Sequence, residues 1–282
     1  MTLANGFLPL FVNFSRFPCY NSAMAELSDA ITFLGTAGAR FVVARQFLAS
    51  GGAWLSLGNT QILLDPGPGC LVQAARRKLD PTKLDAIILS HRHLDHSGDI
   101  NIMIEAMTDG GTKKRGTVFA PSDVLNQDPV ILSYLQSYPQ DIQVLTEGGS
   151  YTINDVSFDT PVRHKHPVET YGFVFQTPRH TFSWITDTRY FEELAGHYEG
   201  DLLVINVVRL KPGAPIDHLS LPEAKSIIEK LKPRIAILTH FGMTMWRAKP
   251  WELANRLTQE TGISVIAARD GMRFDLTQLD NL

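Results

Sequence analysis

The chain has 282 residues, of which 44% are hydrophobic and 20% are charged, a composition typical of globular domains. This length can form one large domain or two modest ones. The formal net charge of −3, from 26 basic and 29 acidic side chains, argues against the strongly charged surface that attracts nucleic acids or membranes.

Cysteine content and hydropathy indicate the cellular compartment and whether the chain crosses a membrane. Two cysteines, Cys19 and Cys70, are too few for a disulfide framework and indicate a reducing, cytoplasmic compartment. No apolar run approaches the roughly 20 residues that a membrane-spanning helix needs, so we expect no membrane association. The sequence does not set the oligomeric state, and a homodimer is one alternative.

The first 23 residues differ from the rest of the chain. Residues 6–14, GFLPLFVNF, are apolar, but no basic cluster precedes them and no convincing small-residue cleavage site follows, so a secretory signal is disfavoured. Met24 begins MAELSDAITFLGTAG, a natural approach to a first strand at residues 31–34. We predict that residues 1–23 are a dispensable extension. Residues 24–282 should form a single domain, because no Pro/Ser-rich linker interrupts them.

Strands dominate the first part of the chain, and strands alternate with helices in the last part. The run LDAIILS at residues 84–90 is continuously apolar and should be buried on both faces. After it, a stripe at helical spacing is formed by Ile100, Ile102, Met103, Ile104 and Met107. The expected strands are residues 31–35, 53–58, 60–65, 84–90, 117–121, 151–162, 171–177, 181–186, 201–208, 234–240, 263–268 and 272–276. The expected helices lie in residues 66–79, 99–107, 221–233 and 250–262. This order predicts an α/β domain with two mixed sheets flanked by helices.

Residues 90–99, SHRHLDHSGD, place three histidines and two aspartates directly after the buried strand. A loop there can turn His91, His93, Asp95 and His96 toward one point. Imidazole and carboxylate suit zinc, iron or manganese, and a set without thiolates argues against structural zinc. Four such close ligands cannot all serve one ion with good geometry, but they can serve two adjacent ions. The alternative, a solvated polar loop, does not need this residue set at a buried strand's edge.

The motif His91-x-His93-x-Asp95-His96 resembles the signature of the metallo-β-lactamase-fold hydrolase superfamily, over about residue 31 to the C-terminus. The resemblance implies an αββα four-layer sandwich. It also implies that an aspartate at the end of an earlier strand braces the site without binding metal, and ILLDPGPG supplies Asp65 in that position.

The superfamily pattern implies three more ligands, each near the end of a strand. RHKHPVETYGF offers two histidines, and the phosphodiesterase-like branch has a histidine six residues before a glycine-aromatic pair, which selects His166. His164 then lies behind the ligands or on the surface. FSWITDT supplies Asp187 and IAILTHFG supplies His240.

The implied arrangement is a dinuclear centre. One ion would be held by His91, His93 and His166, and the other by Asp95, His96 and His240, with Asp187 bridging them. Zinc is the default for a histidine-rich site, although manganese and iron suit the same ligands. A bridging water in such a centre ionises near neutrality, because its pKa falls from about 15.7 to about 7.

This machinery supports hydrolysis of a phosphodiester, a thioester, a lactone or a β-lactam. In IDHLSLPEA, His218 resembles a histidine of the RNase Z-like and phosphodiesterase-like branch that contacts the scissile phosphate or protonates the leaving group. Alternatively it caps the helix that begins near residue 221, a position that Ser220 suits better. Asp95 and His218 are therefore the expected catalytic residues.

Two departures from the tRNA-processing branch disfavour tRNA as the substrate. Pro68 replaces its acidic residue, and no long tRNA-gripping arm separates Asp187 from His240. We expect a small anionic substrate, such as a small or cyclic nucleotide or a short nucleic acid. The alternatives are a thioester or lactone hydrolase of the same fold and, less favoured, a non-catalytic metal-binding or sensor protein.

A glycine-bracketed basic loop, DGGTKKRGT, lies at residues 109–117. Its side chains Lys113, Lys114 and Arg115 can steer an anionic substrate toward the metals. The competing interpretation is a solvated charged loop, which such runs usually form.

Overall fold

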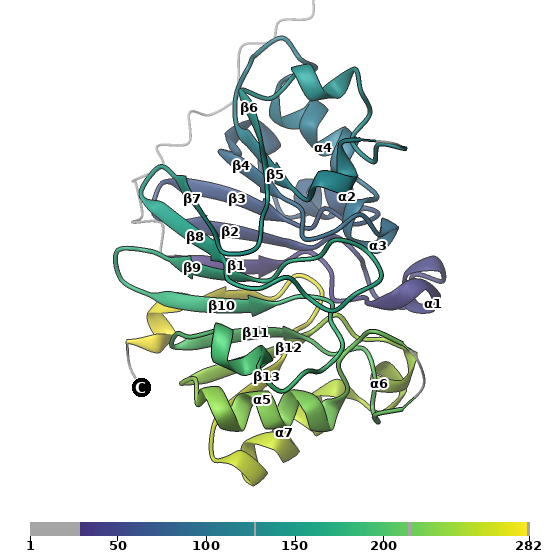
Figure 1. The fold of residues 1–282 in the computed structure, drawn as a ribbon, viewed down its shortest axis with the longest axis vertical. Helices are drawn as coiled ribbons and strands as arrows, with labels where there is room; N and C mark the ends of the chain where they lie inside the picture. Colours follow the sequence, from purple (N-terminus) through teal and green to yellow (C-terminus); the bar gives the residue numbers. More distant parts are fainter. Residues whose placement is uncertain (1–28, 127, 214–215, 281–282) are drawn as a thin grey trace, which may run out of the picture.

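The computed structural model describes residues 29–126, 128–213 and 216–280, so the expectation for residues 1–23 lies outside the described residues. Two seven-stranded sheets face each other, and helices cover their outer surfaces (Figure 1). This arrangement confirms the four-layer α/β sandwich with two mixed sheets.

The first sheet has the strand order β14-β1-β2-β3-β4-β5-β6. Its neighbours are antiparallel from β14 to β3 and parallel from β3 to β6. The strands span Ala30–Phe33 (β1), Ala53–Leu57 (β2), Thr60–Leu64 (β3), Ala86–Ile88 (β4), Thr117–Ala120 (β5), Asp141–Val144 (β6) and Arg273–Asp275 (β14).

The second sheet has the order β13-β12-β11-β10-β9-β8-β7. It is antiparallel from β7 to β10 and parallel from β10 to β13. The strands span Gly149–Ile153 (β7), Val156–Thr160 (β8), Phe173–Gln176 (β9), Thr181–Ile185 (β10), Leu202–Asn206 (β11), Ile235–Thr239 (β12) and Ser264–Ala267 (β13).

Two pairs of helices cover the outer faces of the sheets. Helices α2 (Cys70–Arg76) and α4 (Ile100–Met107) pack on the first sheet, and α5 (Leu221–Leu231) and α7 (Pro250–Thr261) pack on the second. Three short helices, α1 (Ala39–Ala44), α3 (Leu94–Ser97) and α6 (Met243–Arg247), lie at one end of the sandwich, on the right in Figure 1. Among the described residues, no helix has the length and apolar character to cross a bilayer.

Side chains alternate between the two faces of each central strand. In β10, Phe182 and Trp184 point into the core between the sheets, whereas Ile185 packs with the outer helices. Because both faces of β4 are covered, its sequence AII is apolar throughout, as the run at residues 84–90 predicted. Aromatic rings bridge the layers, with the Phe119 and Phe158 ring centroids 5.1 Å apart.

Several sequence expectations need correction. Residues 151–162 are not one strand but parts of β7 and β8, which reverse at Asn154 with a left-handed φ of 55°. Ile102 does not belong to the buried stripe of α4, since it is 42% exposed. The short elements α1, α3, α6 and β6 were not predicted, because each is too brief to show a period.

Phe158→Ala should lower the free energy of unfolding by about 3–5 kcal/mol, because it removes a fully buried ring that joins the two sheets. Urea denaturation measures the change. The matched control is Val72→Ala on α2, where the side chain is 52% exposed, and it should stay within about 0.5 kcal/mol. Equal losses in both variants would contradict this packing.

Candidate metal centre

The ends of strands from both sheets meet at the end of the sandwich that carries α3. Asp65 directly follows β3, and His91 lies just beyond β4 in the first sheet. In the second sheet, Asp187 lies just beyond β10 and His240 directly follows β12. Because β3 is parallel to β4 and β10 is parallel to β12 through β11, these carboxyl ends share one edge in each sheet.

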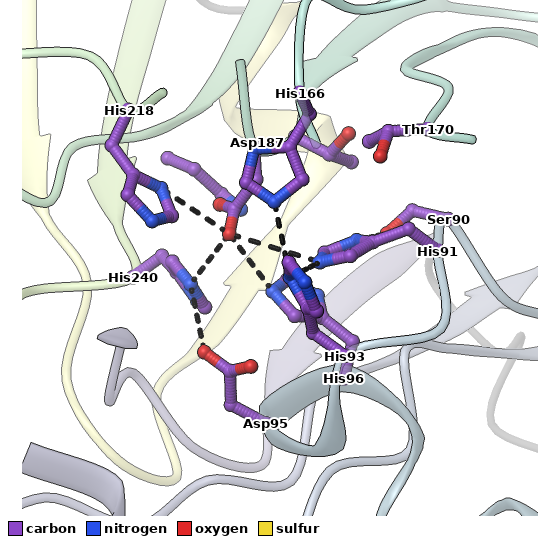
Figure 2. Close-up of polar contacts among 12 residues, drawn as sticks. Ser90, His91, His93, Asp95, His96, His166, Thr170, Asp187, His218 and His240 are labelled. Carbon is purple, nitrogen blue, oxygen red and sulfur yellow. Dashed lines mark hydrogen bonds and ion pairs between the residues drawn. The ribbon is translucent and has the colours of Figure 1, made fainter. Parts of the chain in front are cut away.

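A first group of nitrogen atoms is formed by His91, His93 and His166 (Figure 2). His93 Nδ1 lies 3.1 Å from His91 Nε2 and 3.1 Å from His166 Nε2. All three candidate ligand atoms lie within 4.8 Å of one another. The structure therefore brings together side chains that are 75 positions apart in the chain.

A second group contains Asp95, His96, Asp187 and His240. Asp187 Oδ2 lies 3.3 Å from both His96 Nε2 and His240 Nε2, and His240 Nε2 lies 3.6 Å from Asp95 Oδ2. The same Asp187 oxygen is 4.0 Å from His91 Nε2 in the first group. Asp187 thus stands between the two groups (Figure 2).

Hydrogen bonds from behind fix the orientation of these side chains. Asp65 Oδ2 accepts a hydrogen bond from His96 Nδ1 at 2.8 Å and from the Ser90 hydroxyl at 2.7 Å. Because a carboxylate only accepts, His96 keeps its proton on Nδ1 and turns Nε2 toward Asp187. This is the bracing position expected for Asp65.

Other partners orient the remaining ligand candidates. His166 Nδ1 donates to the Asp217 carbonyl at 2.9 Å, and Asn206 Nδ2 donates to Asp187 Oδ1 at 2.9 Å. These bonds leave His166 Nε2 and Asp187 Oδ2 facing the cluster. Such supporting bonds are the usual accompaniment of metal-binding histidines and carboxylates.

Burial controls the protonation of the first group. Desolvation lowers the pKa of His91, of His93 and of His166, the last to about 4. These imidazoles are therefore neutral around pH 7, which is the form that binds a metal.

The second group favours positive charge. Burial opposes ionisation of Asp187, but His240, His218 and His96 outweigh it and hold its pKa well below the usual range. Burial lowers the pKa of His96, but Asp65 and Asp187 outweigh it and raise it well above the usual range. The carboxylates thus stabilise a cation among them.

Two buried nitrogen atoms of the site have no hydrogen-bond partner. They are His240 Nε2, which faces Asp95 and Asp187, and His218 Nδ1. Buried polar atoms are normally satisfied, so an orphan among carboxylate oxygens indicates a position that a cation fills. Imidazole and carboxylate donors without thiolate fit zinc, manganese or iron. The residues present therefore fit divalent metal ions.

The family model for the β-lactamase superfamily domain matches residues 60–241, a span that contains the whole cluster. The chain belongs to the β-lactamase superfamily. Its members are metal-dependent hydrolases, so the resemblance drawn from the sequence is confirmed.

Individual relatives agree with this membership. The chain is 32% identical to the uncharacterized protein MJ1374 of Methanocaldococcus jannaschii over 87% of this chain and 94% of that protein. Among solved structures, it is similar to the metallo-β-lactamase-fold protein YhfI from Bacillus subtilis, with a TM-score of 0.72, 21% identity, and 87% and 98% of the two chains covered. It is also similar to a diphosphatase of the PhnP family, with a TM-score of 0.65, 20% identity, and 88% and 97% covered.

In this superfamily member, His218 lies at the cluster and not at a helix cap. Its Nδ1 is 3.4 Å from Asp187 Oδ2. Helix α5 begins after Ser220, whose N–H and hydroxyl donate to Glu223 Oε2 at 2.7 and 2.6 Å. Arg209 holds the loop in place, since its Nε and Nη2 donate to the His218 carbonyl at 3.2 and 2.8 Å.

His164 lies behind Asp187 and outside both groups. Its Nδ1 is 3.2 Å from the Asp187 carbonyl oxygen, and its Nε2 is 2.5 Å from the Tyr198 hydroxyl. Desolvation lowers the pKa of His164 to about 3, so it stays neutral. It therefore supports the backbone of Asp187 without facing the cluster.

The basic loop of residues 109–117 lies away from the cluster. Lys113 pairs with Asp109 at 2.9 Å, and Arg115 donates to the carbonyls of Thr82 and Leu84. Lys113, Lys114 and Arg115 precede β5, and Thr82 and Leu84 precede β4, which is parallel to β5. The histidines follow β4. The loop therefore lies at the opposite edge of the sheet.

Sequence reasoning missed two supporting residues. Ser90 gives its N–H and hydroxyl to Asp65, and Asn206 fixes Asp187. A signal existed for Asn206, because it is a polar residue that ends the apolar run LLVIN. The role of Ser90 had no signal beyond its place before His91.

His164→Gln should make the protein less sensitive to acid. The folded-state pKa of His164, about 3, is below its unfolded value of about 6.5, so the unfolded chain binds more protons between these values and stability falls as pH falls below 6.5. Between pH 7 and pH 5, the variant should lose about 2 kcal/mol less than the wild type in urea unfolding. Exposed His197→Gln is the control. Equal acid sensitivity of His164→Gln and wild type would contradict a buried neutral His164.

Proposed function

We propose that this β-lactamase superfamily member is a dinuclear metal-dependent hydrolase that cleaves a phosphodiester in a small or cyclic nucleotide or a short nucleic acid. The observation that carries the proposal is the position of Asp187 Oδ2, within 3.3–4.0 Å of nitrogen atoms from both ligand groups. A single structural ion does not require two adjoining groups that share a carboxylate.

The assignment of ligands follows the two groups. His91, His93 and His166 would hold one ion, Asp95, His96 and His240 the other, and Asp187 would bridge them. Zinc is the first choice, and manganese or iron fit the same donors. When bound, the two ions supply Lewis acidity toward the phosphoryl group and a water acidic enough to attack at neutral pH.

Two residues of the chain act on the reactants. Burial lowers the pKa of His218. We assign its imidazole N–H a hydrogen bond to a phosphoryl oxygen. Asp95 keeps its charge, because His96 and His240 outweigh the effect of burial and lower its pKa. Its carboxylate can orient the attacking water as a hydrogen-bond acceptor.

The small size of the proposed substrate rests on the segment between Asp187 and His240. Its described residues form β11, α5 and their connections, without a protruding domain that could grip tRNA. The similarity to a diphosphatase of the PhnP family supports phosphoryl chemistry. A thioester or lactone hydrolase remains the second candidate, since the same ligands can activate water against either group.

A substrate panel separates these candidates. The zinc-loaded protein is assayed with bis-p-nitrophenyl phosphate, a cyclic nucleotide, a thioester and a lactone. We expect the highest kcat/KM for a phosphodiester and loss of turnover after chelation, with recovery when zinc is restored. A preference for the thioester or lactone would replace the proposed substrate class, and turnover of none would favour a sensor role.

His218→Ala should lower kcat/KM for phosphodiesters by about 100-fold, because it removes a donor to the phosphoryl oxygen. The loss should be the same for p-nitrophenyl and alkyl leaving groups. Exposed His197→Ala is the matched control and should stay near the wild-type rate. A loss confined to the alkyl leaving group would assign His218 to leaving-group protonation instead. An unchanged kcat/KM would show that His218 has no catalytic role.

A further inference from the structure

The cluster opens to solvent on one side. His91, His96 and Asp187 are buried, whereas His93, Asp95 and His166 are partly exposed. A substrate must therefore reach the ligand groups past these three residues.

A pocket of about 420 Å³ adjoins this open side. His93 forms part of its wall, and Val168, two residues after His166, forms another part. The first turn of α3 and the start of α4 complete one side, through Leu94 and Asn101. The pocket is therefore continuous with the partly exposed side of the candidate metal centre.

Apolar side chains make up most of the pocket surface. Leu94 projects into solvent with 76% of its surface exposed, although it stands between two candidate ligands. Pro129, Val130 and Val168 also line the pocket. Apolar side chains that stay exposed beside a candidate reaction site indicate contact with a ligand.

The polar groups of the wall already have partners. Arg92 Nη2 lies 3.3 Å from Asp128 Oδ2 and donates to the Asp128 carbonyl at 3.0 Å. Asn101 donates to the Val130 carbonyl and accepts from the Leu132 N–H, both at 2.9 Å. The Ser97 hydroxyl donates to the carbonyls of Arg92 and His93. The lining thus combines an apolar surface with the Arg92–Asp128 ion pair, which carries no net charge.

We propose that this pocket binds the uncharged organic substituent of the phosphodiester, such as an aryl group or a nucleobase, while the phosphoryl group lies at the candidate metal centre. The inference rests on the proposed function and specifies its substrate. A second phosphate would require an unpaired cation, and Arg92, the cation in the lining, is paired with Asp128. The volume fits one ring system and is within the range of small-molecule pockets.

The test compares two phosphinates, which carry the PO₂⁻ group of a phosphodiester but have no scissile ester bond. Diphenylphosphinate and dimethylphosphinate are titrated into the zinc-loaded protein by calorimetry. The wild type should bind the diphenyl compound at least about tenfold more tightly, because one phenyl ring enters the apolar pocket.

Val130→Trp should fill the pocket and abolish this preference without changing the affinity for dimethylphosphinate. Val72→Trp, on the exposed side of α2, is the matched control and should keep the preference. Leu94→Ala is a second variant that only shortens an exposed side chain, and it should reduce the preference severalfold. Circular dichroism melting confirms that each variant is folded.

Equal binding of the two phosphinates by the wild type would overturn the proposal, as would a preference that survives in folded Val130→Trp. A different outcome is that a short oligonucleotide binds more tightly than diphenylphosphinate and loses as much affinity in Val130→Trp. That result would show that the pocket holds several nucleotides of a strand and not one substituent, and it would also overturn the proposal. Selective diphenylphosphinate binding by a protein that cleaves no phosphodiester would uphold the pocket and reject the proposed reaction. The two failures are therefore distinguishable.

Discussion

A buried carboxylate, Asp187, is the constraint around which the site is arranged. Removing an ionised carboxylate from water is costly unless positive charge and hydrogen bonds compensate for the lost hydration. One oxygen of Asp187 accepts from Asn206, and the other faces nitrogen atoms of His96, His218 and His240. These nitrogen atoms and the carboxylates of Asp95 and Asp187 enclose a space whose donor atoms fit a divalent cation.

The sandwich fold supplies this convergence. Each sheet has a parallel half, and the carboxyl ends of those halves meet at one end of the molecule, with α1, α3 and α6 around them. The apolar core between the sheets, which includes Phe158 and Phe182, anchors the strands whose ends carry the site. Function therefore resides in short loops, while stability resides in the layers beneath them.

The local part of the candidate site could be predicted from the sequence. His91, His93, Asp95 and His96 are adjacent in the chain, and strand-end placement follows from the apolar run before them. His166, Asp187 and His240 were found through family resemblance, because periodicity does not show which strand ends meet in space. The position of the basic loop could not be predicted for the same reason, since a charge run does not reveal at which end of the strands it lies. Short elements such as β6 lack the length to show a pattern.

We propose that the two ligand groups hold two divalent ions, one on either side of Asp187. Anomalous X-ray diffraction from crystals grown with zinc, measured above and below the zinc absorption edge, tests this proposal. We expect two anomalous peaks, one bounded by His91, His93 and His166 and the other by Asp95, His96 and His240, each within ligand distance of Asp187. One peak, or none at this position, would contradict a dinuclear centre.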